Sequence, residues 1–202
     1  VSLDLYMCTN CGHVQLIDVI HPDILFGNYV YVTQVSKILV DYFKQYAHDV
    51  LEKYKPSKGA LVVDIGSNDG TFLNFFKDAG LRVLGIEPAS RIASLARETG
   101  VETCSAYFTP ELALELKKGH GPANIVTANN VFAHADNLGE ILDGIRNLLK
   151  PDGVFIFEVS YLVDIVQKML FDTVYHEHLC YHSVKSFKIF FQSHGMELVD
   201  VE

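Results

Sequence analysis

The sequence lacks any long hydrophobic segment. No apolar run reaches the roughly 18 residues that a membrane-spanning helix needs, and Val1 to Tyr6 contain neither the basic region nor the apolar stretch of a secretory signal. Basic residues are also few, because 16 Lys and Arg stand against 25 Asp and Glu and give a formal net charge of −9. Binding to nucleic acid or to an anionic membrane requires clustered Lys and Arg. We therefore expect neither as a partner.

Cysteine is scarce as well. The chain holds four, which are Cys8, Cys11, Cys104 and Cys180. Without a secretory signal, reduced thiols in the cytoplasm are expected. Cys8 and Cys11, followed by Gly12, have the spacing of half a structural zinc site, in which two thiolates share one tight turn. His13 is too close to be a third ligand, so the remaining ligands are expected upstream; the alternative is a reduced pair without metal.

Apolar residues, in contrast, are plentiful. They make up 49% of the chain against 20% charged residues, which allows a full hydrophobic core and argues against wholesale disorder. Residues 1–35 are rich in aromatic residues and turn formers, and Tyr6 to Leu16 is expected to form a turn between two short strands. We assign residues 1–35 to the end of a zinc-binding lobe with its linker, and residues 36–202 to a larger domain.

Helical and extended patterns alternate in this larger domain. Apolar residues three to four positions apart predict a helix over 36–54. Strands are expected at 60–65, 82–87, 101–104, 123–129, 154–159 and 197–201, helices at 71–79, 90–99, 110–118, 138–149, 162–170 and 184–194, and a turn at 151–153. Repeated βα units predict an α/β fold with a mostly parallel, doubly wound sheet.

A turn with two glycines joins the first of these strands to its helix. The pattern Asp64-x-Gly66-x-x-x-Gly70 follows the strand, and glycine lets the backbone turn tightly and approach a ligand closely. In open α/β sheets, ligands bind beyond the carboxyl ends of the strands. The spacing differs from the dinucleotide pattern G-x-G-x-x-G and suits an aminoacyl-nucleoside better. Asn68 and Asp69 supply polar groups at the tip of the turn.

Two further strands end in residues suited to the same ligand. Glu87, followed by Pro88, lies about 20 residues after the turn, where an acidic side chain accepts hydrogen bonds from both ribose hydroxyls. The strand at 123–129 ends at Asn129, and Asn130 and Phe132 follow it. Alone, the glycine turn could equally be an ordinary connection between strand and helix. Together, the three strand ends predict S-adenosylmethionine, or S-adenosylhomocysteine, as the cofactor of a Rossmann-like, class I methyltransferase.

A histidine-rich segment lies beyond the strand at 154–159. Tyr175-His176-Glu177-His178 places two imidazoles, a carboxylate and a phenol at four consecutive positions. The two histidines could belong to a metal site, although the pattern is not H-E-x-x-H and shows no clear third ligand. The segment could also simply cap a helix.

Six segments resemble those of one family, the nucleotide-sugar C-methyltransferases that methylate a 4-keto-deoxysugar. They are Tyr6 to Gly12, Asp64 to Gly70, Gly85 to Pro88, Ala128 to His134, Glu158 to Leu162 and Tyr175 to His178. Members have an N-terminal zinc lobe, a central cofactor-binding domain and a C-terminal domain that helps to bind the sugar nucleotide. The resemblance implies that this chain covers the end of the first and most of the second, without the seventh strand that usually ends the sheet. Ser160 stands where the family pattern Glu-Val-Pro-Tyr has its proline.

The resemblance also implies roles for single residues. Methylation of a carbon beside a ketone needs a base that removes a proton from that carbon, followed by attack of the enolate on the methyl group. His178 is then the base, while Tyr175 and Glu177 line the sugar site. His134 lies near the enolate, and Tyr29 closes the pocket from the N-terminal lobe, although a packing role for Tyr29 is an equal alternative. This chemistry requires no catalytic metal.

Two other functions stay open. The chain could methylate oxygen or nitrogen of another small metabolite, or it could be a non-catalytic domain that binds S-adenosylmethionine. In each case we expect a small-molecule ligand, a cytoplasmic location and a monomer.

Overall fold

The computed structural model describes residues 1–26 and 29–202, and its largest feature is a parallel sheet with the strand order β5-β4-β3-β6-β7. These strands are β3 (Leu61–Ile65), β4 (Arg82–Ile86), β5 (Thr103–Cys104), β6 (Ala123–Asn129) and β7 (Leu149–Glu158). The chain begins at the centre with β3, winds outward to β5, and then returns to β6 and β7 on the other side. The predicted doubly wound α/β fold is confirmed. Because β3 and β6 are neighbours, their carboxyl ends meet where the winding reverses.

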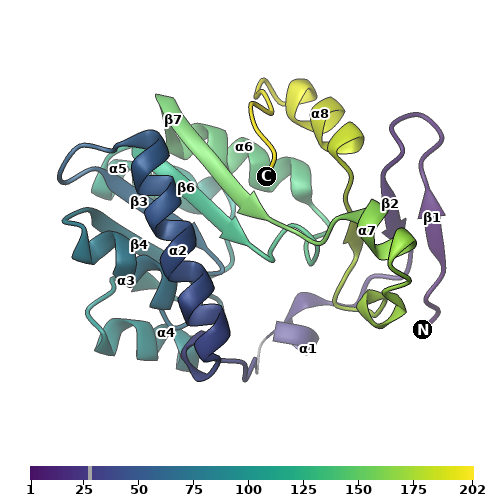
Figure 1. Cartoon of the computed structure of the whole chain (residues 1–202), viewed down its shortest axis with the longest axis horizontal. Coiled ribbons are helices and arrows are strands. Elements are labelled where there is room, and N and C mark those ends of the chain that lie inside the picture. Colours follow the sequence, from purple (N-terminus) through teal and green to yellow (C-terminus); the bar gives the residue numbers. More distant parts are fainter. Residues whose placement is uncertain (27–28) are drawn as a thin grey trace.

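Helices cover both faces of this sheet (Figure 1). They include α2 (Lys37–Tyr54), α3 (Thr71–Asp78), α4 (Ser90–Glu98), α5 (Pro110–His120), α6 (Leu138–Leu148) and α8 (Val184–Ser193). One hydrophobic cluster packs the sheet against α5, α6 and α8, and another packs it against α2 and α3. All five residues of β3 are buried, as expected for a strand that is covered on both faces.

Local signals set the ends of these helices. Ser36 caps α2 by accepting a hydrogen bond from the backbone N–H of Leu39, and Lys55 ends the helix in the left-handed conformation. Thr109 caps α5 in the same way, with Pro110 in the first turn. Such signals explain why the predicted helix ends lie close to the observed ones.

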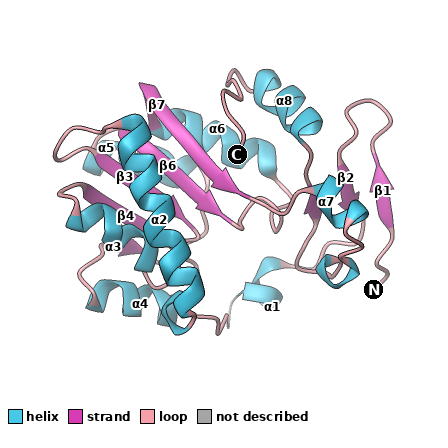
Figure 2. Ribbon diagram, in the orientation of Figure 1, coloured by secondary structure: helices cyan, strands magenta, loops and turns pink. Residues whose placement is uncertain are grey.

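A second, antiparallel sheet lies beside the first (Figure 2). It consists of β1 (Leu5–Met7), β2 (Val14–Leu16) and β8 (Cys180–Tyr181), in the order β1-β2-β8. The hairpin β1–β2 confirms the turn predicted between Tyr6 and Leu16. Its partner β8 comes from far along the chain, so this sheet contains residues from both sides of the proposed boundary at residue 35.

Residues 197–201 do not form the predicted sixth strand. In the described part of the chain, the parallel sheet ends at β7 and no strand pairs with this segment. Val199 and Val201 are exposed, whereas Asp200 and Glu202 form ion pairs with Lys53 of α2. The tail is therefore held by charges against a helix, and the alternating valines that suggested a strand face solvent.

Smaller differences concern the ends of three elements. β7 begins at Leu149, so the turn predicted at 151–153 lies within the strand, next to an irregularity in its register with β6. α7 (Leu162–Gln167) ends before Leu170, and Met169 has a φ of 55° that a helix does not accommodate. α1 (Pro22–Phe26) is a helix where none was predicted, because five residues are too few to show a hydrophobic period.

Candidate active site

Two glycines shape the turn after β3. Gly66 and Gly70 have φ values of 71° and 77°, in the left-handed region that glycine adopts without strain. A Cβ atom at Gly66 would lie 2.6 Å from Cγ2 of Val131, in the loop that follows β6. The turn thus requires glycine both for its conformation and for its close approach to this loop.

Asp64 stands at the start of the turn, where it is 3% exposed. The hydroxyl of Thr127 in β6 donates a hydrogen bond of 2.6 Å to its carboxyl group. Burial raises the pKa of Asp64 to about 7; the nearby charge of Glu87 adds to the shift and the hydrogen bond from Thr127 opposes it. A buried carboxylate is stabilised by a cationic neighbour. The ammonium group of an aminoacyl-nucleoside would supply one.

Glu87 follows β4 directly and is also buried. Its Oε2 accepts a hydrogen bond of 3.1 Å from the backbone N–H of Asn68, and its Oε1 one of 2.8 Å from that of Ala89. Burial raises its pKa, and these two hydrogen bonds oppose the shift. Each carboxylate oxygen can accept a second hydrogen bond. Glu87 therefore shapes the turn and still has acceptor sites for two ribose hydroxyls, while the neighbouring Pro88 is half-buried.

Asn68 and Asp69 face the N-terminal part of the chain. Asn68 Oδ1 accepts a hydrogen bond of 3.0 Å from the backbone N–H of Thr33, and its Nδ2 donates one of 3.0 Å to the carbonyl of Tyr31. Asp69 accepts a hydrogen bond of 2.9 Å from the backbone N–H of Gln34. These side chains, which the sequence suggested as cofactor ligands, fasten the segment 29–35 across the turn. We call this segment the strap.

The carboxyl end of β6 carries an acceptor without a donor. Asn129 Oδ1 is buried, and no described residue donates a hydrogen bond to it. Asn130 follows with a φ of 56°, and its side-chain amide donates a hydrogen bond of 3.2 Å to Glu158 at the end of β7. A buried acceptor that lacks a donor is costly. Asn129 is therefore suited to receive a hydrogen bond from a ligand.

Phe132 differs from the other residues proposed to bind the cofactor. Its side chain is 0% exposed and stacks on Phe157, with ring centroids 5.6 Å apart. Phe132 also packs against Phe187 of α8. In this structure its side chain belongs to the hydrophobic core, and a cofactor contact of Phe132, which could involve only its backbone, stays a prediction.

The histidine-rich segment lies at the same edge of the sheet. The rings of His178 and of His134, which is in the loop after β6, have centroids 5.0 Å apart. Tyr175 packs against His178 with centroids 4.2 Å apart, and its hydroxyl lies 3.1 Å from His178 Nε2. The fold thus brings together three of the five residues for which the resemblance implies a catalytic role.

Both imidazoles have the same hydrogen-bond pattern. His134 Nδ1 lies 2.7 Å from the carbonyl oxygen of Glu177, and His178 Nδ1 lies 2.7 Å from that of Thr173. Because a carbonyl only accepts, Nδ1 carries the hydrogen in each neutral ring and Nε2 keeps its lone pair. Burial, together with a smaller effect of His178, lowers the pKa of His134 to about 4. His134 is therefore neutral at pH 7.

Two aromatic residues from the N-terminal part complete this cluster. Phe26 of α1 contacts both His134 and Tyr29, with ring centroids 5.5 and 5.9 Å apart. Burial raises the pKa of Tyr29, and the nearby charges of Glu177 and Tyr175 raise it further. Tyr29 thus remains a donor at neutral pH, close to Glu177. The sequence did not indicate Phe26, because the short helix that carries it shows no pattern.

Tyr107, in the loop after β5, is another residue at this edge that the sequence did not indicate. Burial raises its pKa to about 12, and Asp23 of α1 and Glu87 contribute to the shift. The ring is 40% exposed. Its place one strand beyond Glu87 suits it to contact the base of a bound nucleoside. A single tyrosine in a loop has no spacing signal that would have revealed it.

The thiols of Cys8 and Cys11 lie on the turn between β1 and β2. The backbone N–H of Cys8 donates a hydrogen bond of 2.8 Å to the carbonyl of His13, and that of Gly12 donates one of 2.9 Å to Cys8. Backbone N–H groups of Cys11 and Asn10 lower the pKa of Cys8, which favours a thiolate. In the part of the chain that the structure describes, no three His, Cys, Asp or Glu side chains gather as a metal site. The turn therefore offers two thiols but no complete zinc site.

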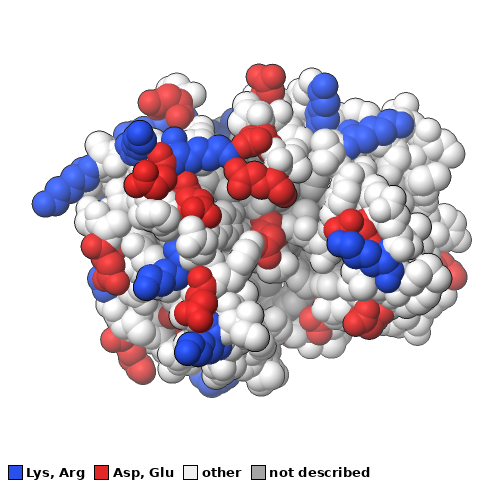
Figure 3. Space-filling model, viewed as in Figure 1, with Lys and Arg blue, Asp and Glu red and all other residues white. Residues whose placement is uncertain are grey.

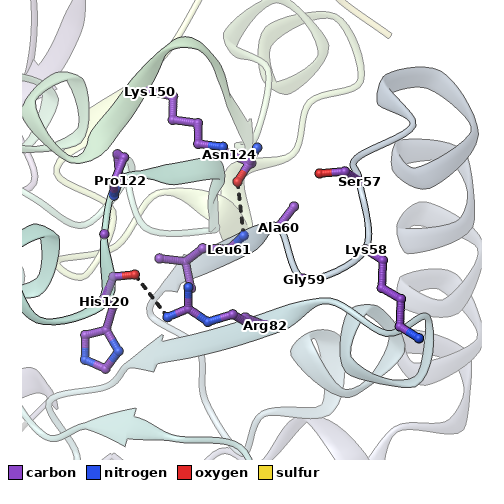
Figure 4. Close-up of a pocket in the computed structure, with 11 residues that line it drawn as sticks. Ser57, Lys58, Gly59, Ala60, Leu61, Arg82, His120, Pro122, Asn124 and Lys150 are labelled. Carbon is purple, nitrogen blue, oxygen red and sulfur yellow. Dashed lines mark hydrogen bonds between the residues drawn. The ribbon is translucent and has the colours of Figure 1, made fainter.

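A hollow of about 230 Å³ lies at the opposite, amino-terminal edge of the parallel sheet (Figure 4). Arg82 donates a hydrogen bond of 3.0 Å to the carbonyl of His120 there, and Asn124 accepts one of 3.1 Å from the backbone N–H of Leu61. These hydrogen bonds satisfy backbone groups at the last residue of α5 and the first residue of β3. The residues proposed to bind the cofactor and the histidine pair lie at the other edge of the parallel sheet.

The charges on the surface are mixed. On the face shown in Figure 3, Lys and Arg side chains lie interspersed with Asp and Glu. Among the residues that the structure describes, no helix combines the length and the apolar character needed to cross a membrane.

Comparison with known proteins agrees with this geometry. Residues 39–201 match the family model described as a methyltransferase domain. The chain belongs to the class I, S-adenosylmethionine-dependent methyltransferases. The methyltransferase is 41% identical over 199 residues to the C-methyltransferase NovU of Streptomyces niveus, a match that covers 98% of this chain and 47% of NovU. The chain thus spans about half the length of this relative.

Solved structures support the same fold. A methyltransferase of Haloferax volcanii, in complex with the Trm112 methyltransferase activator, has a TM-score of 0.63 at 18% identity, over 81% of this chain and 73% of that one. Phosphoethanolamine N-methyltransferase 2 of Haemonchus contortus, in complex with S-adenosyl-L-methionine, has a TM-score of 0.52 at 15% identity, over 81% of this chain and 42% of that one. At these identities the likeness concerns the fold alone.

The residues at the carboxyl edge fit S-adenosylmethionine. The glycine turn leaves room for close approach, and Asp64 is a buried carboxylate suited to a cationic amino-acid end. Glu87 keeps free acceptor sites for a ribose, and Asn129 keeps an acceptor without a donor. This set of groups therefore suits both the amino-acid end and the ribose of the cofactor that the family uses.

Proposed function

We propose that this methyltransferase methylates carbon next to the ketone of a nucleotide-linked 4-keto-deoxysugar. The observation that carries the proposal is the pair His134 and His178, two imidazoles whose Nδ1 atoms donate to backbone carbonyls, so that each Nε2 can accept a proton at the edge that holds the cofactor turn. A carbon acceptor has to lose a proton before it can attack a methyl group, so it needs such a base. The likeness to NovU, which is named a C-methyltransferase, supports carbon as the acceptor, and the resemblance of Tyr175 to His178 supports the sugar nucleotide.

His178 is the base in this proposal. Its Nδ1–H donates to the carbonyl of Thr173, which holds the ring and leaves Nε2 to accept a proton. The proton on the carbon beside the ketone moves to Nε2, and the electrons of the broken C–H bond form the enolate. Bound S-adenosylmethionine supplies the electrophilic methyl group that this carbon then takes up. Tyr175, hydrogen-bonded to Nε2, keeps the ring in place until the substrate arrives.

The enolate oxygen needs hydrogen-bond donors. Burial raises the pKa of both Tyr29 and Tyr175, so that their hydroxyls keep their protons and can donate. His134 lies near the enolate, but its neutral Nε2 accepts rather than donates, which suits it to hold a sugar hydroxyl. In this proposal, the carboxylate of Glu177 accepts hydrogen bonds from sugar hydroxyls as well.

Exchange of the substrate proton with solvent tests the base. In heavy water, with S-adenosylhomocysteine bound, the whole protein should exchange the proton on the carbon next to the ketone of a nucleotide 4-keto-deoxysugar. His178→Ala should slow this exchange about 100-fold or more, the usual contribution of a general base. His48→Ala, an exposed histidine on α2, is the matched control and should exchange like the wild type.

Other outcomes would favour other functions. Unchanged exchange in His178→Ala would remove this residue as the base. A methyl group found on oxygen or nitrogen of the product would identify an O- or N-methyltransferase. Binding of S-adenosylmethionine without any methyl transfer by the whole protein would support a non-catalytic domain.

For Cys8 and Cys11 we propose a structural role as half of a zinc site. A closed zinc site needs four ligands, and we expect the other two from residues outside those described. All four cysteines of the chain are free thiols, so Cys8 and Cys11 are available as zinc ligands. Metal analysis of the whole protein should find about one zinc ion per chain.

A further inference from the structure

Glu158 is the last residue of β7 and the first of the segment Glu158 to Leu162, one of the six that resemble the family. Its carboxyl group is bound from two sides. Oε2 accepts a hydrogen bond from the hydroxyl of Tyr42 in α2, and Oε1 accepts one of 3.2 Å from the side-chain amide of Asn130. Glu158 therefore links α2 to the loop that follows β6.

Tyr42 is held in place by aromatic packing on α2 and α3. Its ring centroid lies 6.0 Å from that of Tyr46, which in turn lies 5.0 Å from that of Phe72 in α3. Burial raises the pKa of Tyr42, and the hydrogen bond to Glu158 raises it further, so that the hydroxyl keeps its proton and remains the donor. The carboxyl group of Glu158 thus has a fixed partner on the side of α2.

Glu158 also contacts Asn130 through its backbone. The backbone N–H of Asn130 donates a hydrogen bond of 2.8 Å to the carbonyl of Glu158. Asn130 has a φ of 56°, in the left-handed region that residues other than glycine rarely adopt. Such a conformation persists where the surrounding structure holds it. Together, the two hydrogen bonds to Glu158 fix both the backbone and the side chain of Asn130.

Asn130 lies between two residues of the candidate cofactor site. Before it, Asn129 carries the buried Oδ1 to which no described residue donates a hydrogen bond. After it, Val131 lies so close to Gly66 that an added Cβ atom there would be 2.6 Å from Val131 Cγ2. The conformation of Asn130 therefore sets the place of the Asn129 acceptor relative to the glycine turn.

The far end of this loop is held by other groups. The backbone of β8 donates a hydrogen bond of 3.0 Å to the carbonyl of Ala133, and His182 Nε2 donates one of 2.8 Å to that of Phe132. Neither hydrogen bond involves Glu158. Loss of the contacts of Glu158 should therefore disturb the start of the loop and leave His134 in place.

We propose that Glu158 is a positioning residue for S-adenosylmethionine. It acts through Asn130, whose conformation it fixes, and so presents the acceptor of Asn129 to the cofactor. The inference rests on the proposed role of Asn129 in cofactor binding and is independent of the proposed sugar substrate. Glu158 acts through its shape and its hydrogen bonds rather than through its charge.

The affinity for the cofactor product tests this role. In calorimetry on the whole protein, Glu158→Ala should raise the Kd for S-adenosylhomocysteine about tenfold, the factor expected when one hydrogen bond to the ligand is lost. Glu158→Gln keeps an acceptor for Asn130 and gains an amide donor for the oxygen of Tyr42, so its Kd should stay within threefold of the wild type. Glu102→Ala changes an exposed glutamate before β5; it is the matched control and should stay within twofold.

A double-mutant cycle tests whether Glu158 acts through Asn130. Asn130→Gly removes the side-chain hydrogen bond, keeps the backbone conformation and should also raise the Kd about tenfold. If the two residues act through one contact, the double variant should bind at most threefold more weakly than either single variant. Independent effects would instead multiply to about 100-fold.

A measurement without ligand separates positioning from a general loss of stability. In Glu158→Ala, the backbone amide of Asn130 should exchange with heavy water at least fivefold faster than in the wild type. The NMR signal of the His134 Nδ1–H, which reports its hydrogen bond to Glu177, should stay the same. A changed His134 signal would mean a wider loss of structure and would count against the proposal.

Three results would overturn the proposal: an unchanged Kd in both Glu158→Ala and Asn130→Gly, equally weak binding by Glu158→Gln and Glu158→Ala, or effects that multiply in the double variant. If Glu158→Ala does not fold, Asn130→Gly and Glu158→Gln decide. If the Kd changes as expected but no 4-keto sugar nucleotide is methylated, the positioning role stands and the proposed substrate is wrong.

Discussion

The carboxyl group of Asp64 is placed where ionisation costs stability until a cation binds beside it. Burial raises its pKa from 3.8 to about 7 in the folded protein. The folded state then binds this proton more tightly than the unfolded state does. Ionisation of Asp64 therefore destabilises the folded state. This destabilisation increases as the pH rises from about 4 to about 7 and is constant above that range.

Asp64→Asn should remove this pH dependence. Without cofactor, the variant should be as stable as the wild type near pH 4 and more stable above pH 7, by an amount on the order of 4 kcal/mol at most. Urea unfolding of both proteins across this range measures the difference. A constant difference at all pH values would show that the Asp64 carboxyl does not titrate there. Calorimetry should in turn show weaker binding of S-adenosylmethionine to the variant, because the buried charge that suits its ammonium is gone.

At this scale, the sequence predicted the kinds of residue at the site but not where each side chain points. Asp64, Glu87 and Asn129 could be identified because parallel strands bring their carboxyl ends to one edge. Asn68 and Phe132 also follow strands that end at this edge, namely β3 and β6. Yet Asn68 faces the strap and Phe132 faces the core. The direction of a side chain depends on tertiary neighbours, which spacing along the chain does not reveal.

Among the elements, the strap depends on a few side-chain hydrogen bonds. Asn68 makes two of them, one as acceptor from Thr33 and one as donor to Tyr31, and its side chain accepts a third hydrogen bond from the backbone N–H of Asp69 within the turn. Asn68 adopts a φ of 49° that glycine also tolerates. Asn68→Gly removes these bonds without adding backbone strain. The variant should lose about 1–3 kcal/mol of stability.

Limited proteolysis should also cut the strap of Asn68→Gly faster than that of the wild type. Asn74→Ala in α3, which loses one exposed hydrogen bond to Thr99, is a matched control and should leave the strap protected. Equal cleavage of both variants would contradict the fastening role of Asn68.

Elements with a strong period or clear ends were predictable, and those made by distant pairing were not. The N-cap residues Ser36 and Thr109 mark the starts of α2 and α5 in the sequence. β8 has only two residues, and its pairing with β2 depends on a partner near the other end of the chain. The segment 197–201 shows the opposite case, because its alternation suited a strand for which the described sheet offers no partner.

The whole molecule consists of a parallel sheet, whose carboxyl edge carries the residues proposed to bind the cofactor, and a small antiparallel sheet whose strand β8 begins two residues after the proposed base His178. S-adenosylhomocysteine at 100 times its Kd should raise the free energy of unfolding by about 2.7 kcal/mol. Hydrogen exchange should show the added protection in β3, β4 and β6, whose carboxyl ends carry the residues proposed to bind the ligand. Amides of the β1–β2 hairpin should gain little, because local opening does not require the large sheet to unfold. Equal protection of the hairpin would mean that both sheets open as one unit.

The pairing of β2 with β8 also has a consequence for the order of folding. Contacts between residues far apart in a chain form late, because closing a long loop costs entropy before the new contacts can stabilise it. Within the parallel sheet, most pairings join strands that are successive in the chain, and the longest joins Val62 of β3 to Ile125 of β6. In the small sheet, Val14 of β2 pairs with Tyr181 of β8. The strand ends proposed to hold the cofactor should thus be able to pair before β8 pairs with β2 next to the proposed base His178. The reactive methyl group and the proposed base would then come together only after the small sheet has formed.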